Sequence, residues 1–449
     1  MHDLLRLITK DDYLGISDAH WPSYEQLLSM SDLPDFITNQ LLILAEYKHK
    51  QHQSRYFCSL AFYGVEYTIP KQFNPKNNTI NNLRCCGGGD VVDKVRKDML
   101  TQKKSKECSR TCWDFEDQGV KSLRQIMNST LDIMLDKDIA HIFEDSRNGP
   151  YEPLIYKIEP SNVCNATCFT CNSSYSSAWG KLESKNGATP DDLIHWVATD
   201  QGFSDGRNLY PIYYQTAKII NFLGGEPTLN KECFKILKYL VDANNVDCNI
   251  SFTTNGTFCF NQDQIRLLKQ FKSMQFNFSI DGIGPVAEYL RYPIKWDHLQ
   301  KKLKWCRDHG FEISVNITVS NLNIYYFDEL ILWLTSNQIH YRIQKAYTHN
   351  KQYSTRCFES SFEIDPRSLS QKIKQAIKDR NKHPLVHEML NQHSDIDDYW
   401  YQQFLLEIIK QDRWKGIKIQ DYLGEFAQLI QEDLNQLLNS QIIPIKAVS

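Results

Sequence analysis

The segment LIYKIEPSNVCNATCFTC, residues 154–171, joins a short apolar run to three cysteines. Leu154–Ile158 has the composition of a buried strand. Cys164, Cys168 and Cys171 follow with the spacing Cys-x3-Cys-x2-Cys, so three thiolates can converge on one centre. Zinc usually takes four ligands, and no fourth Cys or His lies close by in the sequence, whereas iron–sulfur clusters are held by cysteine thiolates. The spacing therefore predicts a [4Fe–4S] cluster with one iron left open.

From about residue 152 the chain alternates short apolar runs with amphipathic stretches. Strands that alternate with helices indicate parallel β-α units. Six such units favour an α/β barrel or an open, partial barrel, with a doubly wound sheet as the alternative. The expected strands are Leu154–Ile158, Ala217–Leu223, Asn249–Thr253, Phe276–Ile280, Ile313–Val319 and Tyr341–Ile343. The expected helices between them are Phe234–Val241, Ile265–Phe271, Leu299–Cys306 and Phe327–Leu334.

Several polar or glycine-rich motifs follow these strands. Most of them come at the carboxyl end of an expected strand, which is where β/α barrels build their active sites. Ser279 and Asp281 also have a purely structural interpretation, because either residue can cap a helix or form a turn. The motifs are Gly224-Gly225-Glu226-Pro227 after the second strand, Thr253-Thr254-Asn255-Gly256 at the end of the third and Ser279-Ile280-Asp281-Gly282 at the end of the fourth.

Together with the cysteine triplet, these motifs resemble the radical S-adenosylmethionine (SAM) superfamily. The resemblance implies that Cys164, Cys168 and Cys171 hold the catalytic cluster and that SAM completes its open iron. It also implies that Gly224, Gly225, Glu226 and Pro227 form the motif that meets the amino group of SAM, with Glu226 accepting a charge-assisted hydrogen bond. Asn255, Ser279 and Asp281 are candidates for the ribose hydroxyls. The alternative is a structural zinc or iron–sulfur site without SAM chemistry.

A second cysteine group precedes the expected barrel and comprises Cys58, Cys85, Cys86, Cys108 and Cys112. The Cys108-x3-Cys112 pair has a spacing suited to one metal, and residues 55–115 are rich in turn signals. This region resembles twitch-domain radical SAM proteins, which carry a shortened SPASM-type auxiliary cluster module. We therefore predict a second [4Fe–4S] cluster on Cys58, Cys85 (or Cys86), Cys108 and Cys112. A zinc knuckle with four cysteine ligands is the alternative.

Composition narrows the class of protein. The chain has 449 residues, of which 41% are hydrophobic, and its 51 basic and 54 acidic residues leave a net charge of −3. This balance makes nucleic-acid binding an unfavoured function, and no apolar run approaches a membrane span. The odd total of 13 cysteines, without a signal-peptide pattern, argues against a disulfide scaffold and for a cytoplasmic protein.

The sequence thus predicts an α/β fold: a partial (β/α)6 radical SAM barrel with a small N-terminal cysteine-rich twitch/SPASM-like module and helical termini. The expected parts are a helical segment over 1–54, the cysteine-rich module and linker over 55–150, the barrel over 151–350 and a helical region over 351–449.

The resemblance implies an oxidoreductase that reductively cleaves SAM to a 5′-deoxyadenosyl radical, which abstracts a hydrogen atom from a substrate. We expect that substrate to be a peptide or protein side chain, and the electron donor to be a flavodoxin or ferredoxin. A small molecule such as a nucleotide or sugar is the alternative substrate, and a non-catalytic iron–sulfur protein is the alternative class.

Overall fold

The structure is a computed structural model, and it describes residues 65–68, 90–117 without 102, 155–187 without 174, 217–345, 369–391 and 398–439, with four single residues between 118 and 130. The chain divides into two compact units. The first comprises Met1–Glu66 and Lys76–Leu154, and the second comprises Tyr67–Pro75 and Ile155–Ser449. The domain boundaries expected from the sequence remain predictions. None of the helices within the described residues combines the length and the apolar character of a membrane span.

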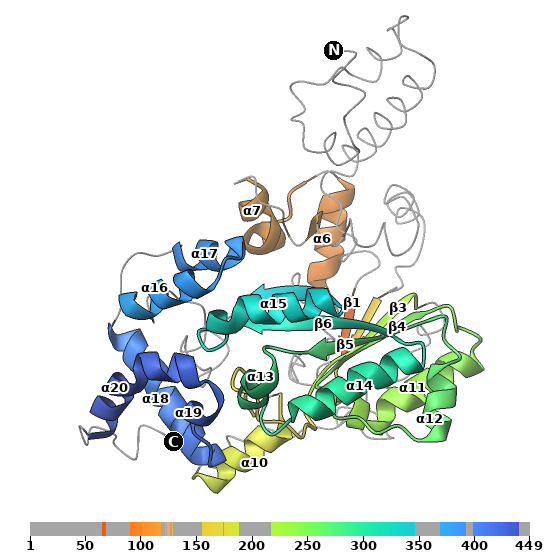
Figure 1. Cartoon of the computed structure of the whole chain (residues 1–449). Helices are drawn as coiled ribbons and strands as arrows, with labels where there is room; N and C mark the ends of the chain where they lie inside the picture. The colour runs from red at the N-terminus through yellow and green to blue at the C-terminus, as the bar shows by residue number, and fades with distance from the viewer. Residues whose placement is uncertain are drawn as a thin grey trace, which may run out of the picture. The chain divides into compact units, whose positions relative to one another are not determined.

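The second unit is built on a parallel sheet (Figure 1). Six of the seven strands of this sheet, β2 to β7, are hydrogen-bonded in chain order, each parallel to the next. This order confirms the expected fold class, because a doubly wound sheet reverses its strand order at a switch point. The strands are β2 (Ile155–Ile158), β3 (Ile219–Phe222), β4 (Asn249–Thr254), β5 (Ser273–Ser279), β6 (Glu312–Val319) and β7 (His340–Lys345). All six strands predicted from the apolar runs are present.

Alternation along the strands gives the sheet one apolar and one polar face. Phe222, Phe252 and Phe276 occupy the same register on three neighbouring strands and are fully buried. Their rings stack at centroid distances of 4.8 and 5.7 Å. One residue earlier, the hydroxyl of Ser251 donates to Asn221 Oδ1 at 2.5 Å on the other face. The aromatic rings therefore belong to the core beneath the helices, while amides and hydroxyls line the opposite face.

Helices follow most of the strands, as the alternating pattern predicts. Helix α11 is a clear case, because Asn230 caps its first turn by accepting from the backbone N–H of Glu232 and apolar residues line one face of the helix. In Figure 1, α11, α12 and α14 lie along the sheet. The helices of this region are α10 (Ser177–Lys185), α11 (Lys231–Asp242), α12 (Gln262–Leu268), α13 (Gly284–Leu290), α14 (Trp296–Asp308) and α15 (Phe327–Ser336).

The C-terminal region is helical, as expected, and it packs on the same unit. Helix α13 contacts α19, and α18 and α16 both contact α20. The Tyr289 hydroxyl on α13 donates to Asp412 Oδ1 on α18 at 2.8 Å, and Asp412 Oδ2 accepts from the Ile419 backbone N–H at 2.7 Å. The helices are α16 (Gln371–Arg380), α17 (Pro384–Asn391), α18 (Asp398–Lys415), α19 (Ile419–Tyr422) and α20 (Gly424–Asn439).

The described part of the first unit surrounds the Cys108–Cys112 pair. It comprises the strand β1 (Val65–Thr68) at the boundary between the units, helix α6 (Asp90–Leu100), a turn over Lys106–Cys108, a π-helical turn over Ser109–Trp113 and α7 (Asp114–Glu116). The indole of Trp113 donates to the Ser105 carbonyl at 2.8 Å, and the Arg124 guanidinium lies over its ring. Arg124 also pairs with Glu116 at 2.6 Å. These interactions therefore stabilise the turns that carry the two cysteines.

The buried Asp412 gives the unit a pH-dependent stability. Burial raises the pKa of Asp412 to about 6, above its ordinary value of 3.8. Between these pH values the folded chain keeps a proton that the unfolded chain has lost, so stability falls as pH rises from about 4 through about 6. Across this window the parent should lose on the order of 2 kcal/mol relative to Asp412→Asn, measured by urea unfolding at a series of pH values.

Asp379→Asn is the control, because Asp379 is an exposed residue of α16. The stability of this variant should depend on pH in the same way as that of the parent. If Asp412→Asn also showed that dependence, Asp412 would not titrate in this range in the folded protein.

Candidate active site

The loop that carries the three cysteines is fixed to the chain that follows β5. The Thr167 backbone N–H donates to the Tyr292 carbonyl at 2.7 Å, and the Phe169 N–H donates to the Leu290 carbonyl at 2.8 Å. These two bonds resemble the rungs of an antiparallel ladder, although residues 167–169 are not a strand. The loop is therefore held at the carboxyl edge of the sheet, beside the end of α13.

Helix α10, which follows the cysteines directly, supplies side chains that bond the loop from the other side. The Ser176 hydroxyl donates to the Ala166 carbonyl at 2.6 Å and accepts from the Trp179 backbone N–H, so it caps the helix and holds the loop together. The Ser177 hydroxyl bonds both the N–H and the carbonyl of Cys164 at 3.1 Å. The Trp179 indole donates to the Cys168 carbonyl at 2.8 Å. Each turn of the loop is thus bonded to a side chain of α10 or its N-cap.

The three thiols lie together and are free of disulfides. Cys168 is buried with Ala166 and Ile294, and Cys164 and Cys171 pack against this cluster. Burial raises the pKa of all three thiols, that of Cys164 to about 12, because nothing positive enough compensates the thiolates. Bound metal ions would reverse this balance, since coordination deprotonates a thiol outright.

Within the described residues, no three Cys, His, Asp or Glu side chains form a site for a single metal ion. A four-iron cluster spreads its thiolates over separate irons, so its ligands stand farther apart than those of one zinc ion. One buried and two half-buried thiols on one anchored loop are the residues that could hold a [4Fe–4S] cluster.

The Gly224-Gly225 turn packs directly against the start of the cysteine loop. The Gly225 N–H donates to the Ser161 carbonyl at 3.0 Å, and the Glu226 N–H donates to the Val163 carbonyl at 2.7 Å. A Cβ on Gly225 would lie 2.3 Å from the Val163 carbonyl oxygen. Gly224 has φ +110° and would place a Cβ 2.6 Å from the Ser161 oxygen. Both glycines are therefore required by the approach of two backbones.

Glu226 is buried and bonded within the protein. Its Oε1 accepts from the Thr228 hydroxyl at 2.5 Å and the Thr254 hydroxyl at 2.8 Å, while Oε2 accepts from the Asn255 backbone N–H at 2.6 Å. Burial raises the pKa of this carboxyl, and these donors oppose the rise. Glu226 thus joins the end of β3 to the end of β4. Its expected contact with the ammonium of SAM remains a prediction. Pro227 starts the 3-10 turn that Glu226 caps.

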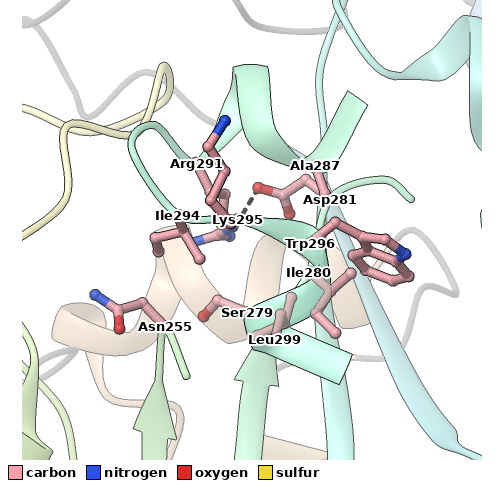
Figure 2. Close-up of a pocket in the computed structure, with 10 residues that line it drawn as sticks. All are labelled: Asn255, Ser279, Ile280, Asp281, Ala287, Arg291, Ile294, Lys295, Trp296 and Leu299. Atoms are coloured by element: carbon pink, nitrogen blue, oxygen red, sulfur yellow. Dashed lines mark ion pairs between the residues drawn. The ribbon is translucent and has the colours of Figure 1, made fainter. Parts of the chain in front are cut away.

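The other predicted residues come together in one pocket, shown in Figure 2. Asn255, Ser279 and Asp281, from the ends of β4 and β5, line it together with Arg291 and Trp296. The Asn255 amide donates to Asn165 Oδ1 at 2.9 Å and lies 3.8 Å from Cys164 Sγ. The pocket therefore adjoins the cysteine loop, as the shared strand ends predict.

Both carboxylate oxygens of Asp281 interact with other groups of the protein. Oδ1 accepts from the Thr318 N–H at 2.8 Å, and Oδ2 pairs with Arg291 Nη2 at 2.7 Å (Figure 2). Arg291 in turn points Nη1 at Cys168 Sγ, 3.9 Å away. The carboxylate of Asp281 thus holds a guanidinium beside the Cys168 sulfur, while its expected contact with a ribose hydroxyl stays a prediction.

The motifs gave no sign of the C-terminal side chains that reach this loop. Gln411 Nε2 on α18 donates to the Phe169 carbonyl at 3.3 Å. The Lys415 ammonium lies 3.7 Å from the centroid of the Phe169 ring and 4.9 Å from that of Trp179. They lie more than 200 residues after the cysteines, so no local spacing could reveal them. The one available signal is a polar residue at a buried position of an apolar helix stripe.

The second cysteine group is only partly described. Cys108 and Cys112 are both buried, four residues apart in the turns that precede α7. Cys58, Cys85 and Cys86 lie outside the described residues. The predicted second cluster therefore remains a prediction.

The close approach at Gly225 makes a testable prediction. Gly225→Ala should force the turn away from Val163, lower the stability by on the order of 1–3 kcal/mol and reduce iron uptake by the cysteine loop. Chemical unfolding and iron analysis measure the two effects. Gly424→Ala is the control, because a Cβ there meets no heavy atom within 4 Å. Parent-like stability and iron content in Gly225→Ala would contradict this packing.

Comparisons with known proteins agree with these features. Residues 158–334 match the sequence profile of the Radical SAM superfamily. The 7-carboxy-7-deazaguanine synthase of Thermoplasma acidophilum is 27% identical over 189 residues, which cover 40% of this chain and 75% of that protein.

Two solved structures are also similar. Native anSMEcpe with bound AdoMet is 15% identical, with a TM-score of 0.34, over 59% of this chain and 63% of its own. Streptococcus suis SuiB bound to S-adenosylmethionine is 15% identical, with a TM-score of 0.31, over 63% of this chain and 61% of its own. This chain thus covers less than two thirds of either solved chain. The residues that match the radical SAM superfamily profile are thus those that carry the cysteine loop and most of the parallel sheet.

Proposed function

We propose that this protein is a radical SAM enzyme whose catalytic cluster is held by Cys164, Cys168 and Cys171. The observation that carries the proposal is the anchored loop with three thiols free of disulfides, one buried and two half-buried, beside a pocket at the carboxyl edge of a parallel sheet. The profile match over 158–334 supports it. When bound, the cluster and SAM would together supply a 5′-deoxyadenosyl radical that removes a hydrogen atom from an unactivated carbon.

The side chains around the pocket have defined tasks in this proposal. The bonds from Ser176, Ser177 and Trp179 keep the three thiolates at fixed positions before any ligand arrives. Asn255 and Ser279 offer an amide and a hydroxyl to ribose, from strand ends that the sheet already orients. Trp296 and Ile294 give the same pocket an apolar wall that excludes water. The protein's contribution is thus positioning and solvent exclusion.

Asp281 and Glu226 act on this site mainly through other groups. Asp281 orients Arg291 toward Cys168, and the fixed guanidinium favours the thiolate form of that ligand. Glu226 holds the Asn255 backbone, which fixes the amide that faces Cys164 and the pocket. A direct bond from Glu226 to the SAM ammonium would have to share Oε2 with that backbone N–H, which a carboxylate oxygen can do.

We propose a peptide or protein side chain as the substrate, supported by the resemblance of the Cys108–Cys112 region to twitch-type proteins. The alternative, a small molecule, is supported by the match to 7-carboxy-7-deazaguanine synthase. The amides and hydroxyls of the inner sheet face, such as Asn221, Ser251 and Asn277, favour a polar group in either case. Turnover in fractionated cell extract, followed by mass spectrometry of the peptide and small-molecule fractions, distinguishes the two.

The proposed chemistry depends on the cysteine loop. Cys168→Ala should abolish formation of 5′-deoxyadenosine from SAM when dithionite is the reductant, because one of three cluster ligands is lost. The assay is chromatography of the anaerobically reconstituted protein with SAM. Cys248→Ala is the control, since Cys248 is a buried free thiol next to the amino end of β4, at the opposite edge of the sheet. Undiminished product from Cys168→Ala would refute the proposal.

We propose, further, that the first unit binds a second [4Fe–4S] cluster through Cys58, Cys85 (or Cys86), Cys108 and Cys112. Cys108 and Cys112 support this proposal because both side chains are buried and lie four residues apart. Four thiolates would leave no open iron, so such a cluster would transfer electrons or hold the module in shape.

Iron content tests the second cluster separately from the first. The reconstituted parent should hold about eight irons, and a variant with alanine at Cys164, Cys168 and Cys171 about four. Alanine at Cys108 and Cys112 together should leave about four irons and keep the dependence of the spectrum on SAM. A barrel triple variant that holds zinc and no iron would rule out the second cluster and indicate a structural knuckle.

A further inference from the structure

Helix α18 carries a buried stripe whose last two members are polar. Phe404, Ile408, Gln411 and Lys415 recur at the spacing of one helix face, and their exposed fractions are 0%, 1%, 0% and 8%. Gly416, with φ +67°, ends the helix immediately after Lys415. An ordinary core stripe would continue with apolar residues, so a glutamine and a lysine at these positions require another explanation.

The Lys415 ammonium is enclosed by aromatic faces and by one amide. It lies over the Phe169 ring at 3.7 Å and the Trp179 ring at 4.9 Å, and it donates to Gln411 Oε1 at 2.6 Å. Within the described residues, no carboxylate lies at ion-pair distance from it, and Glu407 instead pairs with Lys410. Lys415 is thus a buried cation without a paired anion in the part of the chain that the structure describes.

The surroundings of Lys415 indicate which groups would supply a negative charge to pair with it. The rings beneath Lys415 are those of Phe169, inside the cysteine loop, and of Trp179, which bonds the Cys168 carbonyl. Burial lowers the pKa of Lys415 to about 7, and the sulfur of Cys168, the more distant carboxylates of Glu407 and Asp412 and the sulfur of Cys171 act to raise it. A buried charge is costly unless it is paired. Thiolates that ligate iron would provide that pairing.

We propose that Lys415 is a positioning residue whose positive charge raises the reduction potential of the cluster held by Cys164, Cys168 and Cys171, with Gln411 fixing its orientation. This inference rests on the proposed function. Uptake of one electron from an external reductant makes the site one unit more negative, and a nearby fixed cation favours that state. The aromatic faces tolerate the ammonium without neutralising it, whereas a carboxylate would cancel its field.

Arg291 does not make Lys415 redundant. Its guanidinium also faces Cys168, but it is paired with Asp281 at 2.7 Å, so the carboxylate offsets much of its charge at a distance. Lys415 has no such partner within the described residues. We therefore assign to Lys415 a positive charge near the cluster that no carboxylate at ion-pair distance offsets, and to Arg291 the local orientation of Cys168.

The experiment is a redox titration of the full-length, anaerobically reconstituted protein, followed by EPR of the cluster signal that responds to SAM. Lys415→Met should lower the equilibrium constant for one-electron reduction about tenfold, which places the midpoint potential about 59 mV lower. Lys415→Arg, which keeps the charge, should stay within about threefold of the parent. Arg413→Met is the matched control and should leave the potential unchanged, because Arg413 also carries a positive charge on α18 but its side chain is exposed to solvent.

The possible results of the titration lead to different conclusions about Lys415. A Lys415→Met variant that binds the cluster and titrates at the parent's potential overturns this inference and leaves the proposed function intact. A purely structural lysine predicts that same unchanged potential, together with lower stability of the cluster-free chain. If Lys415→Met does not fold, Lys415→Gln carries the same prediction. A parent protein that binds no iron at the cysteine loop refutes the proposed function and this inference with it.

Discussion

The contact between the Gly224-Gly225 turn and the backbone of residues 161–163 determines the geometry of the whole site. Two chain segments more than 50 residues apart approach so closely that neither glycine has room for a Cβ. Their backbones exchange hydrogen bonds in place of side-chain packing. The cysteine loop begins one residue after this contact. Its position relative to the sheet is therefore set by main-chain atoms, which are the least variable parts of the structure.

This contact also changes the interpretation of the glycine motif. From the sequence, the glycines after β3 were assigned to SAM binding, and the structure gives them a role that needs no ligand. The two roles are compatible, because a turn that holds the cysteine loop in place also shapes the space in front of it. Glu226 is similar, since its carboxylate first joins β3 to β4 through Thr254 and Asn255. A motif residue can thus act on a cofactor through the backbone that it holds.

The sheet could be predicted almost completely from the sequence, since runs such as Ile313–Val319 carry both strand propensity and burial. The position of Asn255 and Ser279 could also be predicted, because parallel strands bring both residues to one edge of the sheet independently of the loops. The contributions of Gln411 and Lys415 could not be predicted. They depend on how a distant helix docks, and docking is decided by tertiary packing that no local pattern records. Asp281 lies between these cases, since its place at the strand edge follows from the sequence and its pairing with Arg291 does not.

Burial and charge together explain why the cysteine loop needs the C-terminal helices. A dry site strengthens every electrostatic interaction within it, but it also makes three thiolates expensive when no metal is present. The raised pKa of Cys164 reflects that cost. Helix α18 closes the loop from behind with Gln411 on the Phe169 carbonyl, and it brings a cation to the same place. Helix α18 therefore excludes water from the three thiols and also supplies positive charge. That charge favours the deprotonated form that the thiols would take when they bind metal. A hydrophobic lid would achieve only the first of these effects, which accounts for a lysine at the end of an otherwise apolar stripe.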